Sequence, residues 1–259
     1  MATVIYPSPV FGPVQSRRLG VSLGINLLPG DGKVCSFDCI YCECGLNAQH
    51  VAREPLPSRR AVREALELRL REMALRGKVP DALTFAGNGE PTGHPKFAEI
   101  VDDTLRLRDI YCPKARVCVL SNATFIFRDR VFEALKHVDC NILKLDTVSP
   151  AYIARVNRPA RLLQPDALVS RMKEFGGHCM VQTLFMRGTD FDGRSVCNTG
   201  DEFVLPWVEA VKDIAPQKVM IYTVSRDTPC PTLQKATPAE LDRIKDLLTA
   251  CGLEASVSY

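Results

Sequence analysis

Long apolar runs, a surplus of one charge and internal repeats are all lacking in this sequence. No stretch approaches the roughly 20 apolar residues that cross a bilayer, and the start of the chain has no basic segment followed by an apolar run. Lysine and arginine number 33 against 30 acidic residues, a surplus too small to indicate a polyanionic partner by itself. We therefore expect a cytoplasmic protein with no membrane partner.

Low-complexity tracts and long Gly/Ser linkers are lacking as well, and the 18 prolines are spread between the expected elements. A length of 259 residues with an apolar fraction of 46% suits one globular core. The sequence therefore predicts a single domain over residues 1–259, with an N-terminal extension over 1–20 and a long loop over 29–57.

The cysteines are too scattered for a small disulfide-stapled domain. There are 11, an odd number, in a chain far longer than such domains usually are. Most of them should therefore be reduced thiols in apolar surroundings. Where several cysteines do cluster, in the loop over 29–57, they indicate a metal site.

Short apolar runs alternate with longer helical patterns, which is typical of β/α units around a parallel sheet. The helical patterns begin at Ser58 and near Pro95, Arg128, Pro165, Asp201 and Pro238. The expected strands are residues 21–28, 82–85, 116–120, 141–145, 179–185 and 218–224. Six such units predict an α/β fold, a partial (β/α)6 TIM-like barrel with parallel strands.

One loop holds three closely spaced cysteines. After the first expected strand the chain reads PGDGKVCSFDCIYCECG, in which Cys35, Cys39 and Cys42 have the spacing CxxxCxxC. Three thiolates at this spacing can each bind one corner of an iron–sulfur cube, and the neighbouring glycines let the backbone wrap around it. Because a cube has one more iron than the three cysteines of this motif can bind, one iron is left open to another ligand.

This pattern, with the aromatic Tyr41 directly before the third cysteine, resembles the signature of the radical S-adenosylmethionine (AdoMet) superfamily. The resemblance implies a [4Fe-4S] cluster on Cys35, Cys39 and Cys42, with Tyr41 beside the adenine of AdoMet. It also implies that AdoMet is cleaved reductively to methionine and a 5′-deoxyadenosyl radical, which abstracts hydrogen from a substrate. A low-potential electron donor, flavodoxin or ferredoxin, is the implied partner because the sulfonium is hard to reduce.

Two other classes of protein fit the same cysteines. Cys44 could supply a fourth thiolate to zinc in a nucleic-acid or protein interaction module, although such modules usually have two separated CxxC pairs. Cys44 could also complete the ligands of an electron-transfer iron–sulfur protein that never binds AdoMet. In a radical AdoMet enzyme a fourth thiolate would block the open iron, so there we expect Cys44 only to line the loop.

The second expected strand runs into TFAGNGEPTGHP, which places Gly87, Asn88, Gly89 and Glu90 at the carboxyl edge of a parallel sheet. Glycines there let a ligand approach the backbone, and Glu90 or the carbonyls can accept hydrogen bonds from an ammonium group. The run resembles the GGEP motif of radical AdoMet enzymes, from which Asn88 departs. We expect these four residues to contact the methionine part of AdoMet.

Polar residues also end or follow the later strands, and parallel strands would bring them to one edge. By the resemblance, Ser121, Asn122 and Asp146 are carried over as AdoMet contacts. The other interpretation is that Asn and Asp at strand ends only cap turns. No catalytic residue is assigned. The full set of strand-end residues is Ser121, Asn122, Lys144, Asp146, Gln182, Tyr222 and Thr223.

Segments from about Phe11 to about Pro231 together resemble a subgroup of Fe–S oxidoreductases related to wyosine-tRNA synthetases, among them GPVQSRRLGVSLGINLLP, LKLDTVSP and the NRP at 157–159. An oxidoreductase or transferase acting on a tRNA base, a peptide or a small molecule would fit.

Arginines could bind an anionic group of such a substrate, but solvated arginines are equally ordinary. The candidates are Arg17, Arg18, Arg53, Arg59, Arg60 and Arg63. Cys197 and Cys230 are expected on loops over the barrel mouth.

Overall fold

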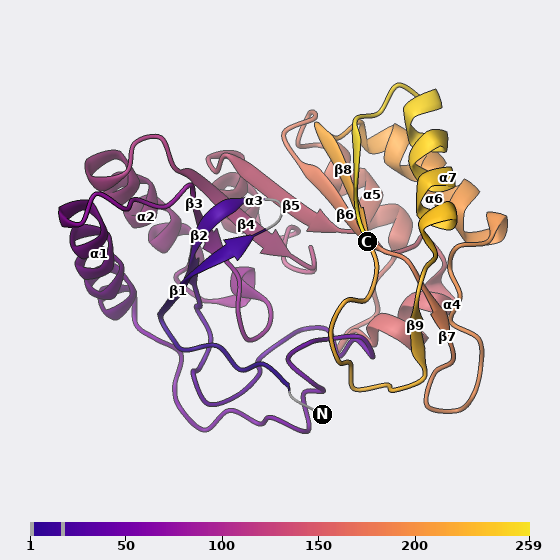
Figure 1. Cartoon of the computed structure of the whole chain (residues 1–259), viewed down its shortest axis with the longest axis horizontal. Helices are drawn as coiled ribbons and strands as arrows, with labels where there is room; N and C mark the ends of the chain where they lie inside the picture. The colour runs from indigo at the N-terminus through magenta and orange to yellow at the C-terminus, as the bar shows by residue number, and fades with distance from the viewer. Residues whose placement is uncertain (1–2, 17–18) are drawn as a thin grey trace.

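In the computed structural model, which describes residues 3–16 and 19–259, one sheet of eight strands curls into a half-barrel (Figure 1). The strand order is β1-β2-β3-β4-β5-β6-β8-β10. Neighbouring strands from β2 to β10 are parallel, whereas β1 joins β2 antiparallel. The strands are β1 Val10–Ser16, β2 Gly20–Ile25, β3 Ala82–Phe85, β4 Arg116–Ser121, β5 Cys140–Lys144, β6 Met180–Leu184, β8 Lys218–Tyr222 and β10 Ala255–Ser258.

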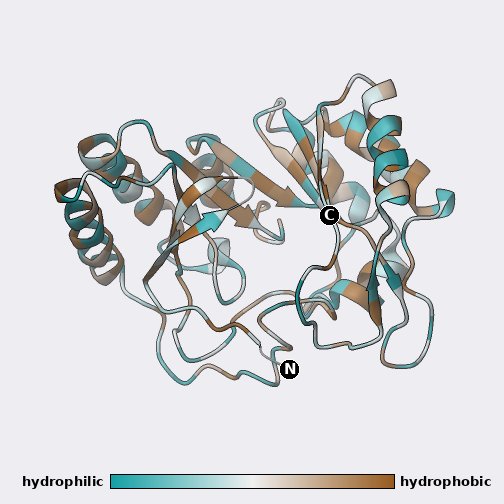
Figure 2. Cartoon of the chain, viewed as in Figure 1, coloured by the Kyte–Doolittle hydropathy of each residue, from teal (hydrophilic) through white to brown (hydrophobic). Residues whose placement is uncertain are grey.

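Helices cover the outer face of this sheet, as Figure 1 shows. The main core lies between the two layers, because alternate strand residues such as Val117 and Val119 point to the helices and Cys118 to the opposite face. Figure 2 shows hydrophobic residues along the strands and hydrophilic ones on the outer sides of the helices. The helices are α1 Arg59–Leu75, α2 Phe97–Tyr111, α3 Asp129–Lys136, α4 Pro150–Tyr152, α5 Pro165–Lys173, α6 Asp201–Ile214 and α7 Pro238–Ala250, with a 3-10 turn over Pro91–Gly93 and a π-type turn over Ile153–Asn157.

The predicted fold class is confirmed. Each expected strand overlaps a parallel strand of the half-barrel, and each of the six helical patterns forms a helix. Side chains cap the first turns of two of these helices. Ser58 accepts a hydrogen bond from Ala61 N at the start of α1, and Thr237 and Glu240 form a capping box at the start of α7.

Three features of the sheet differ from the sequence prediction. Part of the expected N-terminal extension forms β1, and the end of the chain forms β10, one parallel strand more than expected. The strand expected over 21–28 ends at Ile25. There the side chain of Asn26 accepts from Leu28 N at 3.1 Å, which turns the chain out of the sheet. Asn26 N in turn donates to Pro9 O at 2.9 Å.

The carboxyl ends of the parallel strands form an edge that we call the mouth. The loop over 29–57 follows β2 and runs along this edge, in the lower part of Figure 1. A small antiparallel pair, β7 Met186–Gly188 and β9 Leu233–Lys235, extends from the same edge beyond β6 and β8. Among the described residues no helix is both long and apolar enough to span a membrane.

Candidate functional site

The loop over 29–57, called the cysteine loop below, is paired with the GNGEP loop by backbone hydrogen bonds. Val34 N donates to Asn88 O at 2.9 Å, and Glu90 N donates to Val34 O at 3.2 Å. Gly89 makes this pairing possible, because its φ is +137° and a Cβ there would lie 2.0 Å from the Val34 carbonyl oxygen. The two motifs recognised in the sequence are therefore in direct contact.

Cys35, Cys39 and Cys42 are free thiols in one stretch of this loop. Side-chain amides are directed at two of the sulfurs: Asn122 Nδ2 lies 3.7 Å from Cys35 Sγ, and Asn157 Nδ2 lies 3.6 Å from Cys39 Sγ. Hydrogen bonds to cysteine sulfur are among the factors that tune iron–sulfur clusters. Three soft sulfur ligands with amide donors around them therefore fit such a cluster.

The three thiols differ in how readily they ionise. Burial raises the pKa of Cys35 well above its usual range and raises that of Cys39 to about 11. Cys42 behaves in the opposite way, because the Cys44 thiol donates a hydrogen bond to it and Lys33 adds a nearby positive charge, and its pKa falls to about 6. Since thiolates bind metals, Cys42 is the sulfur best prepared to do so.

Cys44 lies between the two motifs. It is buried, its Sγ lies 3.6 Å from Gly87 O, and its hydrogen bond to Cys42 raises its own pKa. These contacts put its thiol in the wall of the loop. That Cys44 is not a cluster ligand stays a prediction.

A buried lysine that the sequence analysis missed lies in the same loop. Lys33 is 4% exposed, and its Nζ donates to Gly45 O at 2.7 Å and lies 3.8 Å from Asp38 Oδ1. Burial lowers the pKa of Lys33, but negative charge at the three cysteines and at Asp38 outweighs this, so the pKa lies above its usual value. Lysine is rarely buried, so nothing in the sequence signalled this position.

Glu90 connects the GNGEP loop to the end of β4. Its carboxylate accepts hydrogen bonds from Ser121 Oγ at 2.9 Å, from Asn122 N at 2.6 Å and from Thr92 N at 3.0 Å. Burial raises the pKa of Glu90, and these donors act against that shift. Three residues predicted to contact AdoMet, Glu90, Ser121 and Asn122, are thus brought together, although the carboxylate is already engaged by the protein.

Asn88, the departure from the GGEP pattern, is fully buried and holds the N-terminal segment over residues 3–9. Its Oδ1 accepts from Tyr6 N at 2.8 Å, and its Nδ2 donates to Tyr6 O and to Pro29 O, each at 2.8 Å. The side chain of Asn88 is therefore used within the protein. A contact from Asn88 to a ligand would have to come from its backbone.

Asp146 joins the cysteine loop to the ends of β5 and β6. Its carboxylate accepts hydrogen bonds from Tyr41 OH, from Asn157 Nδ2 at 2.8 Å and from Leu184 N at 3.0 Å. Burial and the Asp146 charge raise the pKa of Tyr41 well above its usual value, so the hydroxyl stays protonated as the donor. Asp146 thereby holds the aromatic residue that precedes the third cysteine.

Two further groups at this place were not assigned a role from the sequence. Lys144 Nζ donates to Tyr222 OH at 2.9 Å and lies 3.6 Å from Asp146 Oδ1. Asn157 bonds both Tyr41 OH and Asp146, and it ends the π-type turn Ile153–Asn157. The NRP at 157–159 was noticed only as part of a resemblance. In the structure Arg158, the middle residue of that motif, has a left-handed φ of +49° and caps the turn at its C-terminal end.

Among the other candidates from the sequence, Cys230 contacts the cysteine loop, because its backbone N donates to Ile40 O at 3.2 Å. Cys230 is buried and donates to Thr189 O at 3.3 Å, and Cys197 is partly buried beside Thr199. Across the described ranges 3–16 and 19–259, no three His, Cys, Asp or Glu side chains are grouped to hold a single metal ion. Arg59 and Arg60 are paired with Asp103 and Glu64, and Arg17 and Arg18 lie outside the described residues.

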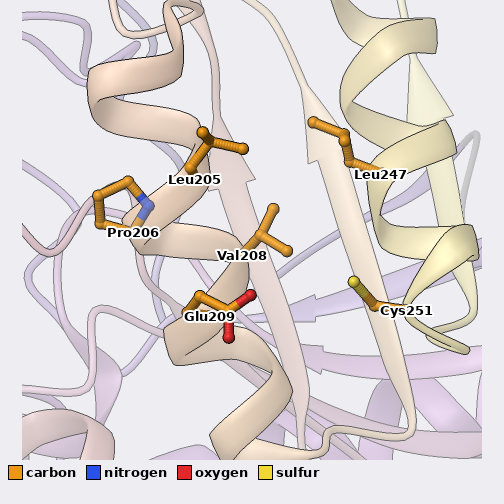
Figure 3. Close-up of a pocket in the computed structure, with 6 residues that line it drawn as sticks. All are labelled: Leu205, Pro206, Val208, Glu209, Leu247 and Cys251. Atoms are coloured by element: carbon orange, nitrogen blue, oxygen red, sulfur yellow. The ribbon is translucent and has the colours of Figure 1, made fainter.

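A pocket on the outer helical layer is separate from the mouth. It lies between α6 and the end of α7, as Figure 3 shows, and is mainly apolar. The lining side chains are Leu205, Pro206, Val208, Glu209, Leu247 and Cys251. None of the residues predicted to bind a cofactor contributes to it.

Comparison with family models matches residues 31–196 to the Radical SAM superfamily, which is more than half of the chain. The chain belongs to the radical SAM superfamily. The recognition made from the motifs is thus confirmed, and the superfamily is one that uses an iron–sulfur cluster and AdoMet.

Two curated relatives resemble this radical SAM chain over nearly its whole length. The UPF0026 protein MJ1312 of Methanocaldococcus jannaschii is 29% identical over 243 residues, 92% of this chain and 69% of that protein. A Brachyspira hyodysenteriae protein named GTPase Obg is 27% identical over 253 residues, 96% of this chain. This chain spans 35% of the length of that relative.

Solved structures share the half-barrel. A radical SAM methyltransferase from Sphaerobacter thermophilus superposes with a TM-score of 0.67 at 14% identity, over 92% of this chain and 66% of that one. TYW1 with a lysine-pyruvate adduct superposes with a TM-score of 0.62 at 14% identity, over 88% of this chain and 73% of that one. At such identities the likeness shows the common fold.

Proposed function

We propose that this chain is a [4Fe-4S]-dependent radical SAM enzyme that cleaves AdoMet reductively and abstracts hydrogen from a substrate. The observation that carries the proposal is the contact between the cysteine loop and the GNGEP loop, where Val34 pairs with Asn88 and Glu90. When bound, the cluster supplies the electron that divides AdoMet into methionine and a 5′-deoxyadenosyl radical.

The cysteine loop supplies the ligands in this proposal. Cys35, Cys39 and Cys42 would hold three irons, and the amides of Asn122 and Asn157 would stabilise two of the thiolate sulfurs. Flavodoxin or ferredoxin would donate the electron. Eleven free thiols suit a reducing compartment such as the cytoplasm.

The mouth would hold AdoMet between these loops. Tyr41, kept in place by Asp146, would lie against the adenine, and the backbone of Gly87, Asn88 and Gly89 would accept hydrogen bonds from the amino group. Ser121 and Asn122 would approach the ribose and the carboxylate. We also propose that residues 1–259 form one core domain, because β1 and β10 bring both ends of the chain into one sheet.

The first test is anaerobic reconstitution followed by iron and sulfide analysis, then reduction with dithionite in the presence of AdoMet and chromatography for 5′-deoxyadenosine. We expect about four irons per chain and formation of the nucleoside. Cys39→Ala should lose both. Cys251→Ala, which removes an exposed thiol at the end of α7, should keep both.

Two outcomes would favour the other classes of protein. Zinc without iron would indicate an interaction module, and a cluster that leaves AdoMet intact under strong reduction would indicate electron transfer. Cys44→Ala also distinguishes the radical SAM enzyme from an electron-transfer protein. It should leave the cluster of the enzyme intact, but it should destroy a cluster that needs Cys44 as its fourth ligand.

A further inference from the structure

One buried positive charge beside the cysteines has no role in the proposed function. Lys33 is 4% exposed and precedes Cys35 by two residues. Its Nζ donates to Gly45 O at 2.7 Å, three residues beyond Cys42. A single side chain therefore spans the loop from before its first cysteine to after its last, and it does so inside the protein.

The surroundings of Lys33 compensate its charge only in part. Burying an ammonium group costs several kcal/mol unless opposite charge and hydrogen bonds offset the loss of water. Asp38 lies 3.8 Å from Lys33 Nζ, but it also lies 3.6 Å from the guanidinium of Arg158. The same carboxylate accepts from Asn47 N at 2.7 Å. One carboxylate shared by two cations leaves an excess of positive charge in the loop.

The cysteines are the groups that can balance this excess. Cys35, Cys39 and Cys42 all lie on the stretch of loop between Lys33 and Gly45, whose carbonyl oxygen accepts the hydrogen bond from Lys33 Nζ. A cluster held by three thiolates carries net negative charge and gains another on reduction. A fixed ammonium group in a site of low dielectric stabilises the more negative form more strongly.

We propose that Lys33 is a positioning residue for the cluster: its ammonium closes the cysteine loop through Gly45 and supplies positive charge that favours the reduced state. The inference rests on the proposed function, since it requires a cluster on the three cysteines. Lys33 lies outside both the CxxxCxxC motif and the GNGEP motif.

Two substitutions separate the charge from the hydrogen bond. Lys33→Gln keeps an N–H donor, one bond shorter, and removes the charge, whereas Lys33→Met removes both. Lys78→Met removes the same charge from an exposed position and is the control. The reduced-to-oxidised ratio of the cluster is measured by electron paramagnetic resonance at the potential where the wild type is half reduced.

We expect the ratio in Lys33→Gln to fall about tenfold, as one lost charge in a site of low dielectric would produce, with at least half of the wild-type iron retained. Lys33→Met should lose more iron as well. Lys78→Met should stay within about twofold of the wild type, because its charge is screened by solvent. A Lys33→Gln ratio within twofold of the wild type would overturn the proposal.

Thermal unfolding of the protein without its cluster distinguishes this role from a merely structural one. There the negative charge of the cluster is absent, so the Lys33 charge lacks its main partner, and Lys33→Met should lower the melting temperature of the apoprotein less than that of the loaded protein. Complete loss of iron from a Lys33→Met protein with unchanged apo stability would support the positioning role. If Lys33→Met lowers the melting temperature of the apoprotein as much as it lowers that of the loaded protein, the result would count against the positioning role.

Cluster uptake and AdoMet cleavage by the wild-type protein distinguish a failure of the proposed function from a failure of the Lys33 proposal. A wild type that takes up no cluster would refute the proposed function and the role of Lys33 together. A wild type that holds a cluster and cleaves AdoMet, beside a Lys33→Gln variant with an unchanged ratio, would refute the role of Lys33 alone.

Discussion

Replacing Asn88 by alanine should weaken the attachment of the N-terminal segment, residues 3–9, to the mouth. The Asn88 side chain is fully buried and makes three hydrogen bonds of 2.8 Å, two with the backbone of Tyr6 and one with Pro29 O. Each contributes about 1 kcal/mol net, and more where truncation leaves a buried partner unpaired. We therefore expect the free energy of unfolding to fall by about 3 kcal/mol.

Urea unfolding measures this change, with the fluorescence of Trp207 as the probe. Trp207 is the single tryptophan of the sequence and is fully buried. In a chain that lacks residues 1–7 only the bond to Pro29 remains, so the cost of Asn88→Ala should fall to about 1 kcal/mol. The difference, about 2 kcal/mol, is the coupling between Asn88 and the N-terminal segment.

A matched control separates this effect from the loss of any buried amide. Asn141 is also buried, but its side chain makes one longer hydrogen bond, 3.3 Å to His178 O. Asn141→Ala should cost about 1 kcal/mol, with or without residues 1–7. The reasoning fails if Asn88→Ala costs as much in the truncated chain as in the full one.

Two further substitutions test the loop pairing and the charge balance. Gly89→Ala, whose Cβ would lie 2.0 Å from Val34 O, should lose at least about half of the reconstituted iron, whereas Gly193→Ala, at φ +76° with open space around it, should retain it. Arg59 donates to Asp103 and lowers the pKa of that carboxyl, so its stabilising effect is present at neutral pH and is lost as pH falls. Urea unfolding should therefore show Asp103→Asn to be less stable than the wild type at pH 7, by a margin that shrinks below about pH 4.

The order of the elements could be predicted from the sequence because it follows from local patterns. The stripe of Val62, Leu66 and Leu70 behind Ser58 predicts a helix, and that helix forms with these side chains buried. The strands β1 and β10 could not be found in this way. Neither strand has a buried residue, so neither shows a clear alternation of buried and exposed side chains, and their pairing with β2 and β8 depends on where the curled sheet ends.

The cysteine ligands of the candidate site were identified from their spacing, but the residues that contact those cysteines were not. Cys35, Cys39 and Cys42 lie in one short segment, so the sequence itself brings them together. Asn157 lies 118 residues beyond Cys39 and reaches its sulfur only because the turn after β5 folds back over the cysteine loop. Spacing along the chain contains no information about such a contact.

By itself, the sequence determined the class of fold, the order of its six β/α units, and the three cysteines with the glycine-rich loop that follows the next strand. These depend on hydrophobic periodicity and on residues close together in the chain. Only the tertiary structure decided that Lys33 is buried, that Asn88 binds the N-terminal segment, and that Asp146 holds Tyr41. The physical reason is that burial and long-range hydrogen bonds depend on which loops are in contact at the mouth. The curvature of the sheet determines which loops these are.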